Sequence, residues 1–416
     1  MKKSTMSLRP VAMAALACLS ALSAGMAHAG EDETPLWLSL AHSITRDNNF
    51  SRNEEKQAET VNTTSLRAGL DKSYGRQTYR AAAKLAASRY ANFGDRLNNE
   101  SKDLDASFTT GIASNWVVST GGSFSENLVP IQDNRVDNRV VRNIKTYRDG
   151  NVAVQYGNGG LWAVVGTFDT NKQTYSEDVY KLQNANQTST GLKAVYYSTD
   201  LLNFSLGGRV VKTNYPNNRS DLTTTDRNVD LSTDWQVSGL SSLEAVLTRR
   251  NTTYSNGAVA VSGWTGSLNW TYTPRGLISY GLGLSRTTGA DRQKSTLVDT
   301  RQNVVGSSEY ASDTVTTALR LSANLRATAK LSFGVNHNIS RYEQDVNSTT
   351  TVGSNSALSG GKYNSIRHTT SLNSNYAVTR AFNLGCGVQR YSQTKDLNRP
   401  NYDGRSVDCN ASFTLD

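Results

Sequence analysis

In the segment VTTALRLSANLR, residues Val315–Arg326, the polarity alternates from one residue to the next. One set of positions reads Val, Thr, Leu, Leu, Ala, Leu, and the intervening set reads Thr, Ala, Arg, Ser, Asn, Arg. A helix would bring positions three and four apart to one face, and that spacing does not sort these residues. A period of two does, so the stretch predicts a β-strand with one apolar and one polar face.

The same period recurs along the chain, with apolar sets at 104–112, 202–206, 229–237 and 331–335. Hydrophobic residues make up only 37% of the chain and its mean hydropathy is −0.51. No later stretch approaches the ~20 apolar residues that a membrane helix needs. A transmembrane β-barrel reconciles these facts, because only every second residue of its strands must face lipid.

Connections of two kinds alternate between the predicted strands. Short turns are expected near 74–77, 114–115, 157–160, 199–201, 238–241, 273–276, 327–329 and 378–380. Longer polar loops are expected near 47–59, 93–100, 128–142, 176–186, 216–224, 255–258, 289–311, 346–362 and 394–404. This order predicts an all-β, antiparallel, up-and-down barrel of about 18 strands, with periplasmic turns, extracellular loops and both chain ends on the turn side.

Two of these loops, 289–311 and 346–362, are rich in Ser, Thr, Asn and Gly and are expected to be mobile. A soluble β-solenoid or sandwich is disfavoured, because no repeat of fixed length appears and the strands exceed the usual sandwich length. Aromatic residues near strand ends are expected to form an interfacial girdle. They are Trp37, Tyr74, Tyr90, Trp116, Trp162, Tyr272 and Tyr376.

The N-terminus has the layout of a secretory signal. Basic residues precede an apolar run over 11–22, and Ala27-His28-Ala29 supplies a small-residue cleavage site. We therefore expect residues 1–29 to be a signal peptide and 30–416 to form the barrel in the outer membrane of a Gram-negative bacterium. Cys18 as a lipoprotein acceptor is the alternative, although the apolar run before it is short.

Assigning the apolar positions to lipid leaves the other set for the barrel interior. The basic residues on that set are Arg67, Arg80, Lys84, Lys193, Arg209, Arg250, Arg320, Arg326 and Arg367. The acidic ones are Asp103, Asp105, Asp230, Asp234 and Glu244, which predicts a mixed but positive wall. Guanidinium groups suit carboxylates and phosphates because they offer two donors in a rigid fork. The alternative is that opposite charges on neighbouring strands neutralise one another.

The two remaining cysteines, Cys386 and Cys409, fall in phase on one face of the last two predicted strands. A cross-strand disulfide is therefore reasonable, and two free thiols are the alternative.

No catalytic, cofactor or metal site is expected. His42, His337 and His368 fall on the lipid-side set, where a catalytic base has no use. Asp47 and its Asn neighbours lack the twelve-residue calcium-loop pattern and are interpreted as turn formers. The bases are spread over alternate strand positions rather than clustered, which argues against nucleic acid as a partner.

Three segments carry a family resemblance: Asp47–Arg52 (DNNFSR), Leu66–Gln77 (LRAGLDKSYGRQ) and the last strand, Asp408–Leu415 (DCNASFTL). They resemble the EpsL-type outer-membrane barrels found with exosortase-associated exopolysaccharide gene clusters. The resemblance covers about the first hundred mature residues and the last thirty, and the middle agrees only in pattern. It implies a non-enzymatic channel or export component whose partners are outer-membrane lipid, an anionic polysaccharide and periplasmic export proteins.

Two other functions stay open at this point. One is a general porin for small anionic solutes. The other is a structural or adhesive surface barrel that acts through the loops at 289–311 and 346–362.

Overall fold

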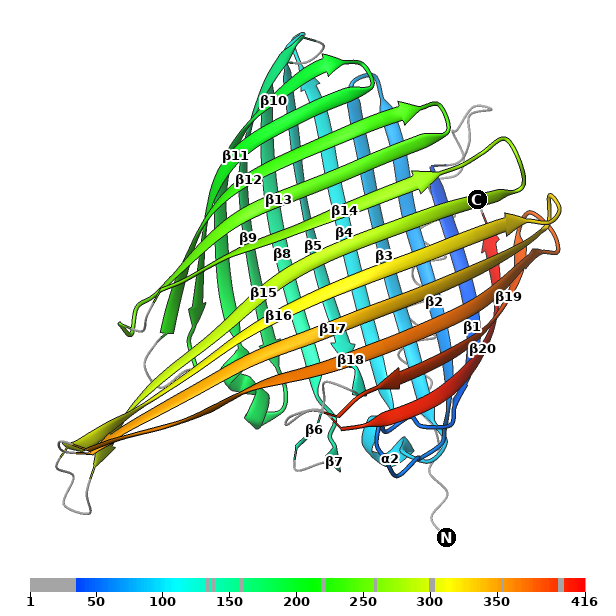
Figure 1. Ribbon diagram of the computed structural model, residues 1–416. Helices are drawn as coiled ribbons and strands as arrows, with labels where there is room; N and C mark the ends of the chain where they lie inside the picture. Colours follow the sequence, from blue (N-terminus) through cyan, green and yellow to red (C-terminus); the bar gives the residue numbers. More distant parts are fainter. Residues whose placement is uncertain are drawn as a thin grey trace, which may run out of the picture.

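The protein folds into one closed antiparallel β-barrel (Figure 1) in this computed structural model. The structure describes residues 35–415 apart from 132–134, 137–138, 158–159, 218–221, 258–259, 299–303, 353–354 and 396–399, and it does not describe the side chains of 135–136, 139 and 290–310. The expected signal peptide, residues 1–29, lies outside the described residues.

Eighteen strands form the main sheet, and each pairs with its neighbours in the chain order. They are β1 (Leu36–Asp47), β2 (Glu59–Tyr74), β3 (Gln77–Tyr90), β4 (Asn99–Ile112), β5 (Trp116–Leu128), β8 (Ile144–Tyr156), β9 (Trp162–Tyr175), β10 (Ala185–Thr199), β11 (Leu202–Tyr215), β12 (Leu222–Ser238), β13 (Ser241–Tyr254), β14 (Val261–Tyr272), β15 (Ile278–Val298), β16 (Val304–Arg326), β17 (Leu331–Val352), β18 (Asn355–Ala377), β19 (Phe382–Gln393) and β20 (Tyr402–Leu415). The pairing of β1 with β20 closes the barrel, so the prediction of eighteen strands is confirmed.

Small elements decorate the loop end. A separate hairpin of β6 (Arg135–Val136) and β7 (Arg139–Val140) lies between β5 and β8. A helical turn, α2 (Gly94–Leu97), follows β3, and a 3-10 helix, η3 (Asp178–Gln183), follows β9. No described helix is long and apolar enough to span a membrane, which says nothing about strands that do so.

The segment Val315–Arg326 forms the last part of β16, and its apolar and polar side chains face opposite sides of the barrel wall. Leu321 pairs with Leu282 of β15 and with His337 of β17, all on the outer surface. Large apolar side chains are exposed all around that surface, including Leu192 at 63% and Leu206 at 59%. The hydrophobic effect would drive such a surface together in water, whereas hydrocarbon accepts it.

The predicted loops at 289–311 and 346–362 are wrong. β15 continues to Val298 and pairs with β16 through most of its length, while β17 and β18 stay paired up to Val352 and Asn355. These two hairpins extend well past the other strands at the loop end (Figure 1). Their Thr, Ser and Gly residues suggested loops. However, hydrogen bonds to an equally long neighbouring strand pair the backbone N–H and C=O groups, and the strands therefore continue.

Two members of the predicted girdle also lie elsewhere. The rings of Trp116, Trp162, Tyr272 and Tyr376 belong to the outward set near the short turns, as does the 75%-exposed Tyr74. In contrast, Trp37 faces inward. Its indole covers Gly69, and the guanidinium carbon of Arg67 lies 5.2 Å from its ring centre.

Tyr90 is likewise on the inner set, and it packs on Phe50 with ring centres 5.7 Å apart. Position near a strand end therefore did not decide which side of the wall an aromatic residue faces.

The last two strands carry a disulfide on the lipid side. Cys386 and Cys409 are direct partners in the ladder between β19 and β20, and the structure joins their sulfur atoms, with Cα atoms 4.1 Å apart. Their neighbours on the same face are Leu384 and Val407, so this bond is in the apolar band.

We expect a Cys386→Ser/Cys409→Ser protein to lose up to about 3 kcal/mol of unfolding free energy, because the disulfide lowers the conformational entropy of the unfolded chain. Urea unfolding in detergent micelles, with and without a reducing agent, measures the loss. The reducing agent should destabilise the wild type once it unfolds and leave the double variant unchanged. A double variant as stable as the wild type would contradict the expectation.

Candidate functional site: the inner wall of the barrel

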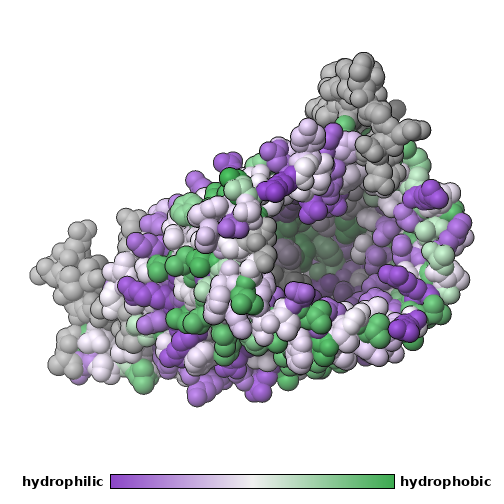
Figure 2. Space-filling model, turned by 90° about the horizontal axis from the view of Figure 1, so that it is seen from above, coloured by the Kyte–Doolittle hydropathy of each residue, from purple (hydrophilic) through white to green (hydrophobic). Residues whose placement is uncertain are grey.

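All nine basic residues predicted for the interior lie on the inner face of the ladder. Leu66 and Leu85 are paired and point outward, so the next pair along the two strands, Arg67 and Lys84, points inward. The other seven basic residues also occupy inward positions on their strands. Seen from above, the wall surrounds a hollow (Figure 2). The long, polar side chains therefore project into a hollow interior.

The prediction of a net positive wall is not supported by the register. The inner face of the described strands also carries one further base, Lys145, and seven further acids: Asp47, Glu59, Asp71, Asp149, Asp169, Asp226 and Asp408. Ten bases thus face twelve acids. The same alternation predicts these positions, since each acid lies an even number of residues from the other inward residues of its own strand.

Many of these charges are paired across neighbouring strands. Arg80 lies 3.2 Å from Asp71, while Arg209 lies 2.9 Å from Asp230. Arg250 lies 2.8 Å from Asp226, which also accepts a hydrogen bond from Thr252. Neutralisation across the ladder therefore accounts for one part of the wall, from β2 to β3 and from β11 to β13.

The arc from β14 to β19 differs from the rest of the wall. Its described inward positions are almost all Ser, Thr, Asn, Gln, Gly or Tyr, and the only charged ones are Arg320, Arg326 and Arg367. Arg326 is at the short-turn end of β16, Arg320 is six residues further along that strand, and Arg367 is ten residues from the end of β18. Three guanidinium groups are therefore spaced along an otherwise uncharged wall of amides and hydroxyls.

Arg367 is the best anchored of the three. Its Nε donates to Oε1 of Gln393 over 3.1 Å, and its guanidinium carbon is 5.7 Å from the ring centre of Tyr342. Arg320 is exposed, and the side chain beside it belongs to Asn338, an amide. Neither guanidinium forms an ion pair within the described part of the chain.

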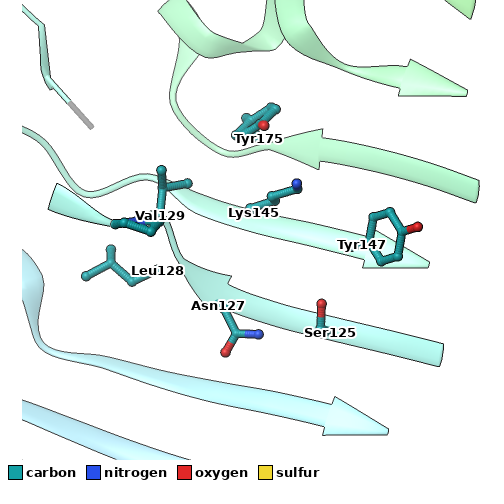
Figure 3. Close-up of a pocket in the computed structure, with 8 residues that line it drawn as sticks. Ser125, Asn127, Leu128, Val129, Lys145, Tyr147 and Tyr175 are labelled. Carbon is teal, nitrogen blue, oxygen red and sulfur yellow. The ribbon is translucent and has the colours of Figure 1, made fainter. Parts of the chain in front are cut away.

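A cavity of about 480 Å³ opens in the opposite wall, near the loop end of β5 and β8 (Figure 3). Lys145 stands at its centre, with its Nζ 5.7 Å from the ring centre of Tyr147 and 5.9 Å from that of Tyr175. Ser125 and Asn127 line the adjacent strand, and Asn127 donates to Asp103 over 2.7 Å. A flat aromatic face, an ammonium and an amide side by side suit a hydroxylated, anionic ligand.

The loop after β1 is locked onto the inner wall at the loop end. Asp47 accepts a hydrogen bond from Nη1 of Arg52 over 2.8 Å, and Arg52 lies over the ring of Tyr391 at 3.7 Å. The buried Asn49 donates to the carbonyl oxygens of Asn53 and Asp403, both at 2.8 Å. These bonds hold Arg52 at φ +53°, a conformation that costs energy for a residue with a side chain.

This cluster contains the DNNFSR stretch, whose Asp and Asn residues the sequence predicts to be turn formers. The stretch is a turn, but its polar residues also join strands from the two ends of the chain, β1 and β19. Sequence alone did not reveal Tyr391 or Asp403 as its partners, because they are more than 340 residues away.

Glu59 anchors the neighbouring loop. Its side chain is 1% exposed, and its two oxygens accept from the backbone N–H groups of Thr60, Ala91, Asn92 and Phe93 at 2.7–3.1 Å. A carboxylate held by several N–H groups needs no counter-ion to be stable when buried. It fixes the chain that leaves β3 against the start of β2.

The histidines take the positions predicted for them. His42, His337 and His368 face outward, and His42 and His337 each lie within 2.9 Å of a threonine hydroxyl on the adjacent strand. Among the described residues, no three His, Cys, Asp or Glu side chains are placed to hold a metal ion.

No protein-family model matches the chain, and no curated protein sequence is similar to it. Solved barrels from Pseudomonas aeruginosa are similar in fold. OccK3 (OpdO) has a TM-score of 0.49 and 13% sequence identity, covering 91% of this chain and 95% of that one. OpdK with vanillate has a TM-score of 0.46 and 11% identity, covering 91% and 98%. The siderophore receptor PirA has a TM-score of 0.41 and 12% identity, covering 92% and 81%.

The chain is an outer-membrane β-barrel. Its closed sheet has no free edge, its outer band is apolar, and the inward positions of its strands are mostly polar, as a strand-built protein of that membrane requires. At these identities, the similarity to the solved barrels concerns the fold alone.

Proposed function

We propose that this barrel is a passive channel through which an anionic exopolysaccharide crosses the outer membrane. The observation that carries the proposal is the arc from β14 to β19, where amides and hydroxyls line the interior and three arginines are the only charged residues among the side chains that the structure describes. The resemblance of the DNNFSR, LRAGLDKSYGRQ and DCNASFTL segments to EpsL-type barrels supports the same conclusion. Periplasmic export proteins belong to this proposal as partners that would deliver the polymer.

The chemistry of the arc suits a moving glycan. Each sugar hydroxyl can exchange one Ser, Thr, Asn or Gln partner for the next at little cost, because neighbouring sites on the wall are nearly equivalent. Carboxylates of the polymer would bind the guanidinium groups of Arg326, Arg320 and Arg367 in turn. Because these groups are spaced along the wall, no single site holds the chain tightly.

The cavity around Lys145 lies near the loop end, where an exported polymer would leave. The faces of Tyr147 and Tyr175 would stack on sugar rings, while Lys145 and Asn127 would bind carboxylate and hydroxyl groups. Nothing in this arrangement breaks or forms covalent bonds, so the proposed role is not enzymatic.

A general porin for small anions is the second candidate. The hollow interior favours it, since a wall that surrounds free space also admits solutes much smaller than a polymer (Figure 2). The three arginines of the arc would attract small carboxylates as well as polymeric ones.

The experiment combines conductance with secretion. We expect the purified barrel to conduct ions in a planar bilayer, and we expect uronic-acid oligosaccharides to interrupt the current at lower concentrations than neutral glucose oligomers of equal length. A strain without this chain should secrete less polysaccharide, and the wild-type chain should restore secretion.

Each outcome separates the candidates. Normal secretion from the deletion strain, together with passage of small carboxylates, would identify a general porin instead. A barrel that passes no ions even after deletion of Asn48–Ala58 would contradict both channel functions. The third function, adhesion through 289–311 and 346–362, would then be examined on the two extended hairpins.

A further inference from the structure

The outward-facing side chains change from uncharged to basic at one height on the barrel wall, which we call a level. Between the short turns and that level, outward-facing strand side chains are apolar, aromatic, small or uncharged, and Lys72 is their only charged member among the described residues. Arg89 and Lys362 face outward nearer the loop end. The other eleven described outward bases, each eight to eleven residues from the short-turn end of its strand, form what we call the basic belt. They are Arg46, Lys102, Arg148, Lys172, Lys212, Arg227, Arg249, Arg286, Arg341, Arg390 and Arg405.

The level of the basic belt is nearly constant around the barrel. Each member lies eight to eleven residues from the short-turn end of its strand; Arg148, for example, is eight residues before Tyr156, where β8 ends. At about 3.3 Å per residue and a tilt of about 40°, this span is roughly 20–28 Å high. The apolar band of such barrels is about 25 Å tall, so the belt lies at its loop-side border.

Several members of the belt are placed where like charges repel. Arg148 and Lys172 are direct partners between β8 and β9, and Arg390 and Arg405 are direct partners between β19 and β20. Like charges directly opposite one another destabilise a sheet. A sequence would keep such pairs only where something of opposite charge compensates them.

The protein itself supplies little compensation. Within the described part of the chain, two members have an acidic partner on this surface: Lys102 with Glu126 at 3.2 Å, and Arg341 with Glu343 at 2.8 Å. Asp403 lies near Arg390 and Arg405, but its carboxylate is bound by Lys56 at 2.8 Å. All eleven side chains of the belt are exposed.

Aromatic rings direct two of these bases along the wall. The guanidinium carbon of Arg148 is 5.5 Å from the ring centre of Phe124, and that of Arg249 is 5.3 Å from that of Trp264. Both rings lie on the outer surface of an adjacent strand. The bases therefore lie close to the surface at the border between hydrocarbon and headgroups, where aromatic rings are favoured.

We infer that the basic belt binds the phosphate groups of the outer-leaflet glycolipid, lipopolysaccharide, chiefly through the pairs Arg148–Lys172 and Arg390–Arg405. Position and chemistry both select this ligand. The belt is at the depth where the acyl chains of the outer leaflet end, and guanidinium and ammonium groups bind phosphate oxygens strongly. Two bases side by side can bind one phosphate, whose negative charge offsets the repulsion between them.

The test titrates a bisphosphorylated lipid A into the full-length barrel in detergent and measures the number of bound glycolipids by native mass spectrometry. Replacing the two pairs in Arg148→Ala/Lys172→Ala/Arg390→Ala/Arg405→Ala should weaken binding at each pair by roughly thirtyfold, because each of its two bases contributes a factor of about five near an anionic surface. The matched control removes four exposed bases outside the belt, through Arg96→Ala, Arg275→Ala, Lys330→Ala and Arg380→Ala. It should bind like the wild type.

Further arms separate the sources of phosphate. Dephosphorylated lipid A should bind at least tenfold more weakly to the wild type, and inorganic phosphate should not compete at millimolar concentration. Equal binding of phosphorylated and dephosphorylated lipid A, or of phosphatidylglycerol and lipid A, would overturn the assignment. So would wild-type affinity in the fourfold variant, provided that its heat-dependent shift on gels shows a folded barrel.

Discussion

Replacing Glu59 by Gln should destabilise the barrel by about 3 kcal/mol, a large loss for one atom exchanged. The wild-type carboxylate is buried and accepts hydrogen bonds from four backbone N–H groups. Hydrogen bonds to a charged acceptor contribute about 1.5–3 kcal/mol each, and an amide would turn an NH2 group toward donors that need an acceptor. The loss should therefore exceed that of a single neutral hydrogen bond.

The measurement is urea unfolding in detergent, accompanied by hydrogen exchange. The amides of Ala91, Asn92 and Phe93 should exchange faster in Glu59→Gln, because their shared acceptor is weakened. Glu100→Gln is the control: Glu100 is an exposed acid on the outer side of β4 whose nearest base is Arg89, 3.8 Å away. It should change the unfolding free energy by less than about 0.5 kcal/mol. Equal stability of the two variants would show that the four N–H groups do not depend on the charge.

Reversing two charges of the arc, through Arg320→Glu/Arg367→Glu, should make the conductance markedly more cation-selective than that of the wild type. The two guanidinium groups are the only charges at mid-height on the described inner surface of β14 to β19, and two reversals change the local charge by four. Inside a lumen with low-dielectric walls, such a change alters local ion concentrations by roughly tenfold or more at low salt.

The reversal potential under a salt gradient across a planar bilayer measures this selectivity. The expected change is a shift of the reversal potential toward cation selectivity, and it should shrink as salt rises from about 0.1 M to 1 M because the Debye length falls from about 10 to 3 Å. Arg341→Glu/Arg390→Glu is the matched control, since it makes the same charge change on the outer surface. A control that shifts the potential as much as the lumen variant would show that selectivity does not arise in the arc.

Much of the fold was predictable from the sequence because alternation is a local property. The runs at 315–326 and 229–237 separate lipid-facing from water-facing positions without any knowledge of their neighbours. The inward phase of Arg320 and the outward phase of His337 follow from the same rule. So do eight short turns, which each require only a few polar or Gly-bearing residues between two alternating runs.

Loops predicted from amino-acid composition were less reliable than strands predicted from alternating polarity. The Thr-rich segment at 346–352 was expected to be a loop, yet it is paired with β16 along its length. Threonine is as well suited to a strand as to a polar loop, and its state depends on whether a partner strand is long enough to pair with it. The position of Trp37 inside the barrel was missed in a similar way, because the space above Gly69 exists only once β1 and β2 are aligned.

From the sequence alone it could be predicted that this chain is a barrel with eighteen strands, which residues of its clearly alternating runs face water, and that Cys386 and Cys409 share a face. These features depend on residues close together in the chain. Which inward charges neutralise one another depends on the folded sheet, as does the presence of arginines without acidic partners among the described inward side chains from β14 to β19. The tertiary structure also decided that Tyr391 closes over the DNNFSR turn and that the outward bases fall at one level. These features depend on the register and closure of the whole sheet, which bring residues hundreds of positions apart to the same height.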